Sequence, residues 1–276
     1  MSNKAGHQAR KRFGQNFLHD PGVIERIIRA INPGPDDSII EIGPGLGALT
    51  EEILAVNPGL QVVELDRDLI PVLRTKFFNY PEFRIHEADA LKFDFSQLMV
   101  DRPLRIIGNL PYNISTPLIF HLLGQAGVVQ DMHFMLQKEV VQRMAAVPGD
   151  NNYGRLGIMT QYFCKVQPLF DVGPGAFRPA PKVDSAIVRL VPHETLPHPA
   201  RDLTTLQAVV RTAFNARRKT LRKALGGMVS VAQLQSLGIN DGLRPENLGL
   251  ADYVAIADLL VNEKGVAKTA SEVSND

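Results

Sequence analysis

A chain of 276 residues is long enough to hold one full α/β domain and a smaller second one, and its 45% hydrophobic content is ordinary for a globular protein. The single cysteine, Cys164, excludes an internal disulfide and a zinc site built from several cysteines, and the seven histidines show no metal-ligand spacing. The basic N-terminus is followed by no apolar segment, and no run could span a bilayer. We therefore expect a cytoplasmic protein without a bound metal.

The net charge is only +1, but two segments concentrate the basic residues. Residues 1–19 carry four basic side chains and residues 203–225 carry six, and neither segment contains an acid. Removing these ten from the 30 basic residues leaves 20 against 29 acidic ones. Two basic patches on an otherwise acidic chain favour a polyanion as partner, with two solvated basic faces as the alternative.

The predicted elements begin after a flexible basic arm over residues 1–12. A helix follows from Pro21 to about Ile31, with Asp20 as N-cap. Buried strands and helices then alternate, which is typical of a parallel sheet covered on both faces. We expect strands at residues 38–42, 61–65, 83–86, 104–108 and 132–136, helices at 138–146 and 154–163, and later strands at about 164–172 and 185–191. The pattern predicts a Rossmann-like α/β domain over residues 1–192.

A proline-rich linker at residues 191–199 precedes a small all-helical domain, which we place at residues 200–264. We expect a disordered tail over residues 265–276. Arg211, Asn215, Arg218 and Arg222 recur at intervals of four, three and four residues, so one helix face would carry them against phosphates without reading base sequence. The predicted RNA-binding residues are Arg211, Arg217, Arg218, Lys219, Arg222 and Lys223.

Four positions in the first domain follow four successive strands at a regular spacing. They are Gly43, Glu64, Asp89 and Asn109, separated by 21, 25 and 20 residues. Each interval is about one strand-helix unit, so all four should lie at the same edge of the sheet, where open α/β sheets bind ligands. Any one of them could be an ordinary loop residue, but four residues at this regular spacing predict one shared crevice.

The glycine turn is ambiguous by itself. Gly43-x-Gly45-x-x-Ala48 fits the dinucleotide fingerprint, and Glu64 stands where a ribose-binding acid would. Glu41 argues against a pyrophosphate, because a carboxylate two residues before the turn repels phosphate and attracts a cationic amine. S-adenosylmethionine carries such an amine and a positive sulfonium, and therefore fits better than NAD.

Asn109-Leu110-Pro111-Tyr112 leads from an apolar strand into a helix, with Ser115 or Thr116 as its expected N-cap. No side chain of these four ionises near neutral pH, so chemistry here needs a co-substrate that is already electrophilic, such as a sulfonium methyl group. The Asn109 side-chain oxygen and the Leu110 or Pro111 carbonyl could accept the N–H groups of a base amine and free its lone pair. Tyr112 would stack on that base after its extrusion from the strand. An ordinary turn is the alternative.

A second aromatic for the base is Phe177, in a rigid, proline-flanked loop at residues 176–181. A loop aromatic that caps the core is the alternative interpretation of Phe177.

Together these motifs resemble the ribosomal RNA small-subunit adenine dimethyltransferases. The resemblance covers residues 10–260 and rests on motifs that occur in order: Lys11 to Leu18, Glu41 to Gly47, Glu64-Leu65-Asp66, Asp89-Ala90, Asn109 to Tyr112 and Phe214 to Lys219. It implies dimethylation of the N6 amines of two adjacent adenosines in the 3′-terminal hairpin loop of 16S rRNA within the small ribosomal subunit. It also implies a role in late ribosome assembly and, in bacteria, a link to kasugamycin sensitivity.

The resemblance also assigns roles to residues. Cofactor contacts are implied for Asn16, Leu18, Gly43, Gly45, Glu64, Asp89 and Asn109. Target-base contacts are implied for Asn109, Leu110, Pro111, Tyr112 and Phe177.

We expect the protein to be a monomer. Two rival functions remain. A DNA adenine N6-methyltransferase would share the sheet and the aromatic turn, but the basic helical domain and the lack of a large sequence-reading domain disfavour it. A non-enzymatic rRNA-binding assembly factor would keep its role after Asn109→Ala or Glu64→Ala.

Overall fold

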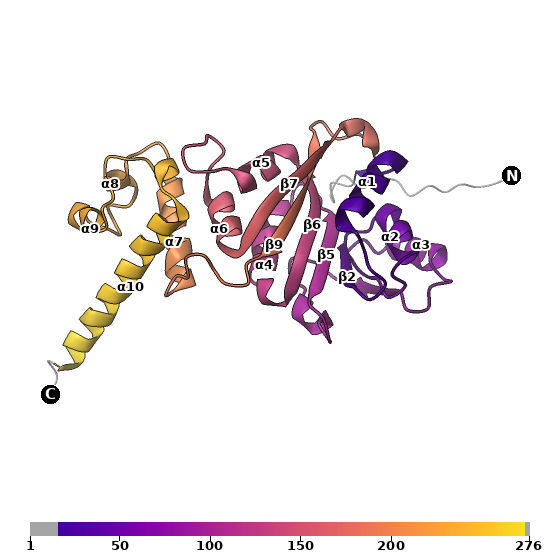
Figure 1. Cartoon of the computed structure of the whole chain (residues 1–276), viewed down its shortest axis with the longest axis horizontal. Coiled ribbons are helices and arrows are strands. Elements are labelled where there is room, and N and C mark those ends of the chain that lie inside the picture. The colour runs from indigo at the N-terminus through magenta and orange to yellow at the C-terminus, as the bar shows by residue number, and fades with distance from the viewer. Residues whose placement is uncertain (1–15, 274–276) are drawn as a thin grey trace. The chain divides into compact units, whose positions relative to one another are not determined.

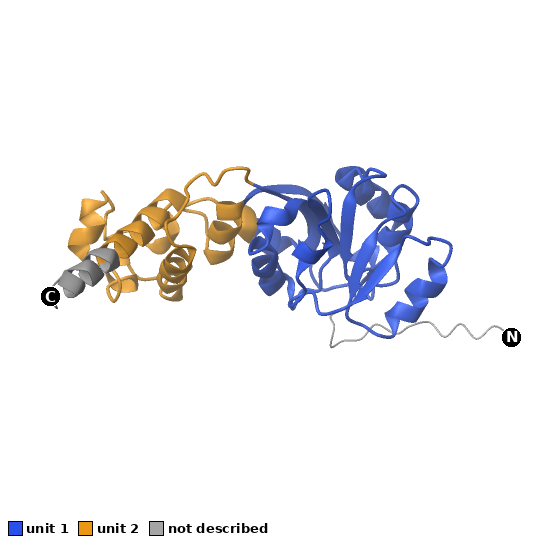
Figure 2. Cartoon of the chain, turned by 90° about the horizontal axis from the view of Figure 1, so that it is seen from below, with its two compact units in different colours: residues 1–142, 164–192 blue, residues 143–163, 193–276 orange. Residues whose placement is uncertain are grey.

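The computed structural model describes residues 16–273, with side chains through residue 263. The basic arm predicted over residues 1–12 lies outside this range. The described chain forms two compact units (Figure 2): residues up to 142 together with 164–192 make unit 1, and residues 143–163 together with those from 193 onward make unit 2.

Unit 1 is built on a seven-stranded sheet with helices on both faces (Figure 1). The strand order is β4-β3-β2-β5-β6-β9-β7. Its strands are β2 (Ser38–Ile42), β3 (Gln61–Glu64), β4 (Arg84–Glu87), β5 (Leu104–Asn109), β6 (Val129–Gln137), β7 (Cys164–Val172) and β9 (Ser185–Pro192). Its helices are α1 (Pro21–Ile31), α2 (Ala48–Leu54), α3 (Leu69–Lys76), α4 (Ser115–Leu123) and the start of α5 (Lys138–Ala145). The chain runs outward from β2 to β4 and then returns to β5 on the other side of β2, which makes a topological switch point between β2 and β5.

The parallel sheet predicted from the alternating strands is confirmed for those strands, and one later strand runs against them. The five neighbouring strands β4, β3, β2, β5 and β6 are parallel to one another. The next strand, β9, pairs antiparallel with both β6 and β7. Only residues 173–184 connect β7 to β9, and such a short connection suits antiparallel neighbours. A small sheet that the sequence did not predict joins β1 (Phe17–Leu18) to β8 (Phe177–Arg178).

Local sequence explains the buried framework of unit 1. Asp20 caps α1, accepting a hydrogen bond from the Val23 amide at 3.0 Å, as predicted. Gly108 allows β5 to lie close to β2, because a Cβ at this position would stand 2.5 Å from the Ile42 carbonyl oxygen. The last residues of β5 therefore run tightly beside the end of β2.

Unit 2 contains α6 (Arg155–Phe163), α7 (Leu203–Asn215), α8 (Leu221–Ala224), α9 (Val231–Ser236) and α10 (Leu250–Val273). Unit 1 ends at residue 192, where the sequence places the end of the first domain, but residues 143–163 belong to unit 2 instead of to the first domain. Side-chain packing explains the difference: the buried ring of Tyr153 meets Phe214 of α7 with centroids 6.3 Å apart, and Phe214 meets Tyr253 of α10 at 6.1 Å.

One prediction in unit 2 is wrong. The continuous helix expected through Arg222 ends at Asn215, because the amides of Leu221 and Arg222 donate to the carbonyls of Leu243 and Asp241 instead of to the preceding turn. Helix α10 extends to Val273, past residue 264, where we placed the end of the helical domain. No helix of the described chain is long and apolar enough to cross a membrane.

Candidate active site

A cavity of about 330 Å³ opens at the carboxyl edge of the unit 1 sheet. Residues at or just after the ends of β2, β3, β4 and β5 line it, including the four predicted from their spacing: Gly43, Glu64, Asp89 and Asn109. The cavity therefore lies at the switch point between β2 and β5, where the sheet leaves room for a ligand. The structure brings these four residues to one site, as the sequence predicted.

The glycine turn after β2 forms one wall. Gly43 and Gly45 have φ values of 66° and 60°, which glycine adopts without strain. The ring of Phe17 lies directly against Gly45, since a Cβ there would be 3.1 Å from it. The segment from Asn16 to Leu18 thus covers the turn, and all three of its residues line the cavity.

The polar part of the lining is acidic. Four carboxylate residues reach it (Glu41, Glu64, Asp66 and Asp89), and no lysine, arginine or histidine is among the described residues that line the cavity. Burial raises the pKa of Glu41 to about 7, although the Thr50 hydroxyl donates to its Oε2 at 2.6 Å. Burial also raises the pKa of Glu64. This lining disfavours a pyrophosphate and favours a ligand with positive charge.

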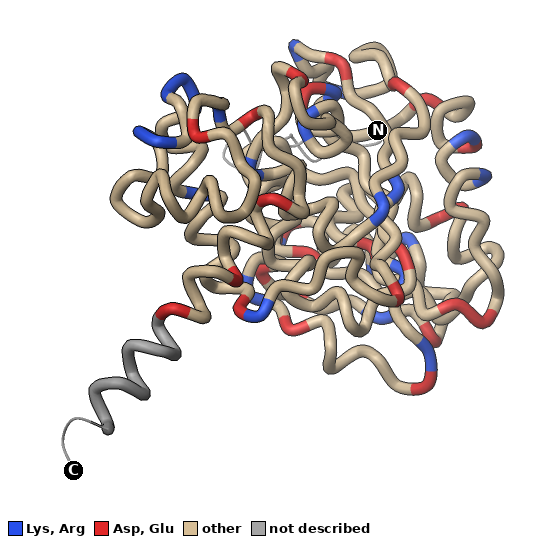
Figure 3. Tube along the Cα trace, turned by 60° about the vertical axis from the view of Figure 1, so that its left-hand side comes forward, with Lys and Arg blue, Asp and Glu red and all other residues tan. Residues whose placement is uncertain are grey.

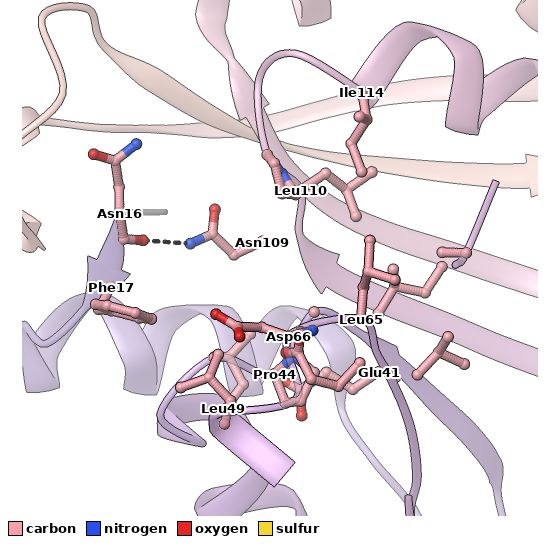
Figure 4. Close-up of a pocket in the computed structure, with 18 of the residues that line it drawn as sticks. Asn16, Phe17, Glu41, Pro44, Leu49, Leu65, Asp66, Asn109, Leu110 and Ile114 are labelled. Carbon is pink, nitrogen blue, oxygen red and sulfur yellow. Dashed lines mark hydrogen bonds between the residues drawn. The ribbon is translucent and has the colours of Figure 1, made fainter. Parts of the chain in front are cut away.

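Asn109 projects toward the cavity from the end of β5 (Figure 4). Its Nδ2 donates to the main-chain carbonyl of Asn16 at 3.0 Å. A carbonyl can only accept, so this bond fixes which end of the amide is nitrogen. The amide nitrogen is thus engaged, and the side-chain oxygen is the acceptor end of Asn109.

The next three residues also line the cavity. The Pro111 carbonyl already accepts the amide of Ile114 at 3.1 Å, so of the two predicted main-chain acceptors Leu110 is the better placed to receive a further donor. Tyr112 is half-buried, and burial raises the pKa of its phenol, which keeps it neutral at physiological pH. The helix begins at Ser115 with Ile114 as N-cap, so the predicted caps Ser115 and Thr116 are wrong. The Ser115 hydroxyl instead donates to the Tyr112 carbonyl at 3.2 Å.

Phe177 is not among the residues that line this cavity. It is 2% exposed and packs in the hydrophobic core with Leu18 and Ala176. The observed arrangement matches the alternative interpretation, an aromatic that caps the core. Its strand, β8, pairs with β1, whose residues Phe17 and Leu18 line the cavity.

Sequence reasoning missed two lining residues with clear roles in shape and charge, Phe17 and Asp66. Asp66 is 2% exposed, and its amide donates to Glu64 Oε1 at 2.8 Å. The sequence signal that could have identified Asp66 was its position two residues after Glu64, the predicted ribose-binding acid. Among the described side chains, no group of His, Cys, Asp or Glu could hold a metal ion.

Figure 3 marks the basic and acidic residues along the chain trace. The predicted basic residues of unit 2 fall into two environments. Arg217 pairs with Glu246 at 2.8 Å and Arg222 pairs with Asp241 at 2.6 Å, so these two arginines help to hold the fold. Arg211, Arg218, Lys219 and Lys223 are exposed, and so is Arg222 despite its ion pair.

Comparison with known proteins agrees with this geometry. The family model for ribosomal RNA adenine dimethylase matches residues 6–262. A ribosomal RNA small subunit methyltransferase A from Marinobacter nauticus is 86% identical over 276 residues, which cover 100% of both chains. One from Hahella chejuensis is 66% identical over 254 residues, 92% of this chain and 93% of the relative. The crystal structure of a dimethyladenosine transferase from Plasmodium falciparum has a TM-score of 0.75 and 30% identity, covering 90% of this chain and 98% of that chain.

The family model spans nearly the whole chain, including both units and every motif that borders the cavity. The acidic lining independently favours a cationic ligand over a dinucleotide. The chain therefore belongs to the ribosomal RNA adenine dimethylase family and is a methyltransferase that uses S-adenosylmethionine.

Proposed function

We propose that this enzyme dimethylates the N6 amines of two adjacent adenosines in the 3′-terminal hairpin loop of 16S rRNA, on the small ribosomal subunit and late in its assembly. The observation that carries the proposal is the neutral Asn109–Tyr112 turn at the rim of an acidic cavity. The relatives named ribosomal RNA small subunit methyltransferase A, at 86% and 66% identity, support the choice of RNA.

The cavity residues suit S-adenosylmethionine by charge and by position. Glu41 and the neighbouring acids would face its positive groups, Glu64 would accept its ribose hydroxyls, and Asp89 would accept its adenine amine. The glycines at 43 and 45 would let the main chain approach it closely. Asn16 and Leu18 would cover it from the N-terminal side.

When bound, the cofactor supplies an electrophilic methyl group, so the protein's task is to present the adenine amine. The Asn109 side-chain oxygen and the Leu110 carbonyl would accept its two N–H groups and draw the lone pair out of the ring. Tyr112 would stack on the extruded base. No base is needed before transfer, because the amine loses its proton only after it has gained the methyl group and a positive charge.

The exposed basic residues of unit 2 would contact rRNA phosphates. Arg211, Arg218, Lys219 and Lys223 are exposed, and phosphate contacts of this kind contribute affinity without base specificity. Arg217 and Arg222 have acidic partners, so we expect them to position this segment more than to bind RNA.

The test is incubation with labelled S-adenosylmethionine and small subunits that lack the modification, followed by nucleoside analysis. We expect N6,N6-dimethyladenosine from the wild type and a loss of at least about 100-fold in rate with Asn109→Ala, comparable to the removal of an aligned transition-state acceptor. Gln130→Ala, which changes an exposed amide at the start of β6, is the control and should keep the wild-type rate. Absence of dimethyladenosine, or an Asn109→Ala variant as fast as wild type, would contradict the proposal.

A further inference from the structure

We propose that Ser185 is a positioning residue of the enzyme, which acts by fixing the ring of Tyr112 in the orientation that receives the target base. The inference rests on the proposed function, in which Tyr112 stacks on the adenine. Ser185 is outside the motifs from which the site was predicted and is not among the residues that line the cavity. Its effect must therefore pass through Tyr112.

Tyr112 needs such support because it lies in a turn after the end of β5, where no strand partner holds it. Its hydroxyl lies 2.7 Å from the Ser185 hydroxyl, and either group can be the donor. The ring is half-buried between this contact and the cavity. A hydrogen bond at the tip of a tyrosine fixes the direction of the ring while leaving its face free for stacking.

Ser185 is a rigid anchor for that bond. It is the first residue of β9 and its exposed fraction is 0%. β9 lies between two partners, so Ser185 stands opposite Gln137 of β6 and Val172 of β7. Because strands on both sides hold Ser185, its hydroxyl has a fixed position, and the hydrogen bond holds the Tyr112 hydroxyl there.

A second serine holds the main chain of the same residue. Ser115, which is 1% exposed at the start of α4, donates from its hydroxyl to the Tyr112 carbonyl at 3.2 Å. Tyr112 is thus fixed at two points, its carbonyl to a helix and its ring tip to the sheet. Of the two contacts, only the one from Ser185 holds the side chain, by fixing the position of the ring tip.

The test is a double-mutant cycle on Ser185→Ala and Tyr112→Phe, because each variant removes the same hydrogen bond from a different end. Steady-state methylation of small subunits should show kcat lowered about two- to tenfold in each single variant, as expected from loss of one hydrogen bond. The KM for S-adenosylmethionine should not change. The double variant should be no slower than the slower single variant, because the bond can be lost only once.

Thr160→Val is the matched control. Thr160 has an exposed fraction of 0% and donates within its own helix to the Leu156 carbonyl at 2.8 Å, so loss of this buried hydroxyl should leave the kinetics at the wild-type level. If Ser185→Ala folds poorly, Tyr112→Phe still tests the bond with Ser185 in place. Wild-type kcat in Tyr112→Phe, or multiplicative losses in the double variant, would overturn the proposal.

Tyr112→Ala separates this inference from the proposed function. A large loss in Tyr112→Ala with wild-type rates in Ser185→Ala and Tyr112→Phe would refute only the positioning role. A Tyr112→Ala variant that methylates at the wild-type rate would refute the stacking role itself, and the positioning role with it.

Discussion

The carboxyl group of Glu41 is the most perturbed acid of the site. It is 2% exposed at the end of β2, and burial raises its pKa to about 7. Thr50 donates to it at 2.6 Å, but Glu64 adds a second negative charge nearby. A carboxylate in this position is costly without a cation, which explains why the site suits a positively charged ligand.

We predict that Glu41 makes the free enzyme less stable as pH rises. Its pKa is higher in the folded chain than in the unfolded one, where it is near 4.5, so the folded state binds the extra proton. The stability that Glu41 contributes is complete below pH 4.5 and is lost as pH rises through about 7. The difference between the folded and unfolded pKa values of Glu41 corresponds to about 3 kcal/mol in the free energy of unfolding. Urea unfolding at pH 5 and pH 8.5 should therefore show a steeper fall for wild type than for Glu41→Gln.

The comparison with Glu41→Gln isolates Glu41 together with its coupling to Glu64, because acids elsewhere in the chain titrate equally in both proteins. Parallel stability curves for the two proteins between pH 5 and pH 8.5 would show that the prediction is wrong. A cationic ligand should lower the pKa of Glu41, so wild-type affinity for S-adenosylmethionine should increase with pH across the same range and that of Glu41→Gln should not.

At the scale of elements, β5 carries the site at one end and a buried ionic network at the other. Arg105, its second residue, donates to both carboxylate oxygens of Asp131 on β6, at 2.9 and 3.2 Å. It also donates to Asp37 at 2.6 Å and to the carbonyl of Ile31 at the end of α1. A cation suits the carboxyl end of a helix, so Arg105 ties β5, β6 and α1 together.

We predict that Asp131→Asn lowers the free energy of unfolding by about 3–5 kcal/mol, because it leaves a buried arginine with only part of its negative partner. Cofactor affinity of the folded variant should be unchanged, since the network lies at the opposite end of β5 from Asn109. Urea unfolding and equilibrium binding measure the two effects.

The matched control for that variant is Glu25→Gln, which breaks the exposed pair between Glu25 and Arg29. This change should cost less than about 1 kcal/mol, as exposed pairs do. Equal losses in Asp131→Asn and Glu25→Gln would refute the structural role of the network.

At the scale of the whole molecule, the proposed chemistry and the proposed RNA contacts fall in different units. The cavity belongs entirely to unit 1, whereas the predicted phosphate-binding residues belong to unit 2. The short turn after α7 carries three consecutive basic residues, Arg217 to Lys219, of which the last two are exposed. Separate units allow affinity and catalysis to be changed independently.

We predict that the double variant Arg218→Ala and Lys219→Ala weakens binding to small subunits and lowers the slope of log affinity against log salt by about 1.5, near 0.7–0.9 for each lost phosphate contact. Its affinity for S-adenosylmethionine should equal that of wild type. Arg102→Ala removes an exposed charge from unit 1 and should leave the salt slope unchanged. A double variant with the wild-type slope would exclude these two residues from phosphate contact.

The sequence by itself determined most of the α/β framework and the location of the site. Short apolar runs, the capped start of α1 and the glycine turn are local signals, so they identify elements without knowledge of their neighbours. The even spacing of Gly43, Glu64, Asp89 and Asn109 then placed four residues at one sheet edge, because parallel strands must all point the same way.

Tertiary structure decided what depends on contacts between distant residues. The orientation of the Asn109 amide is set by a carbonyl 93 residues earlier, and the ring of Tyr112 by a serine 73 residues later. The packing of Tyr153 on Phe214 assigns residues 143–163 to unit 2, and core contacts bury Phe177. The local pattern of apolar and polar residues does not predict such pairs, because each pair forms only when folding brings two remote segments together.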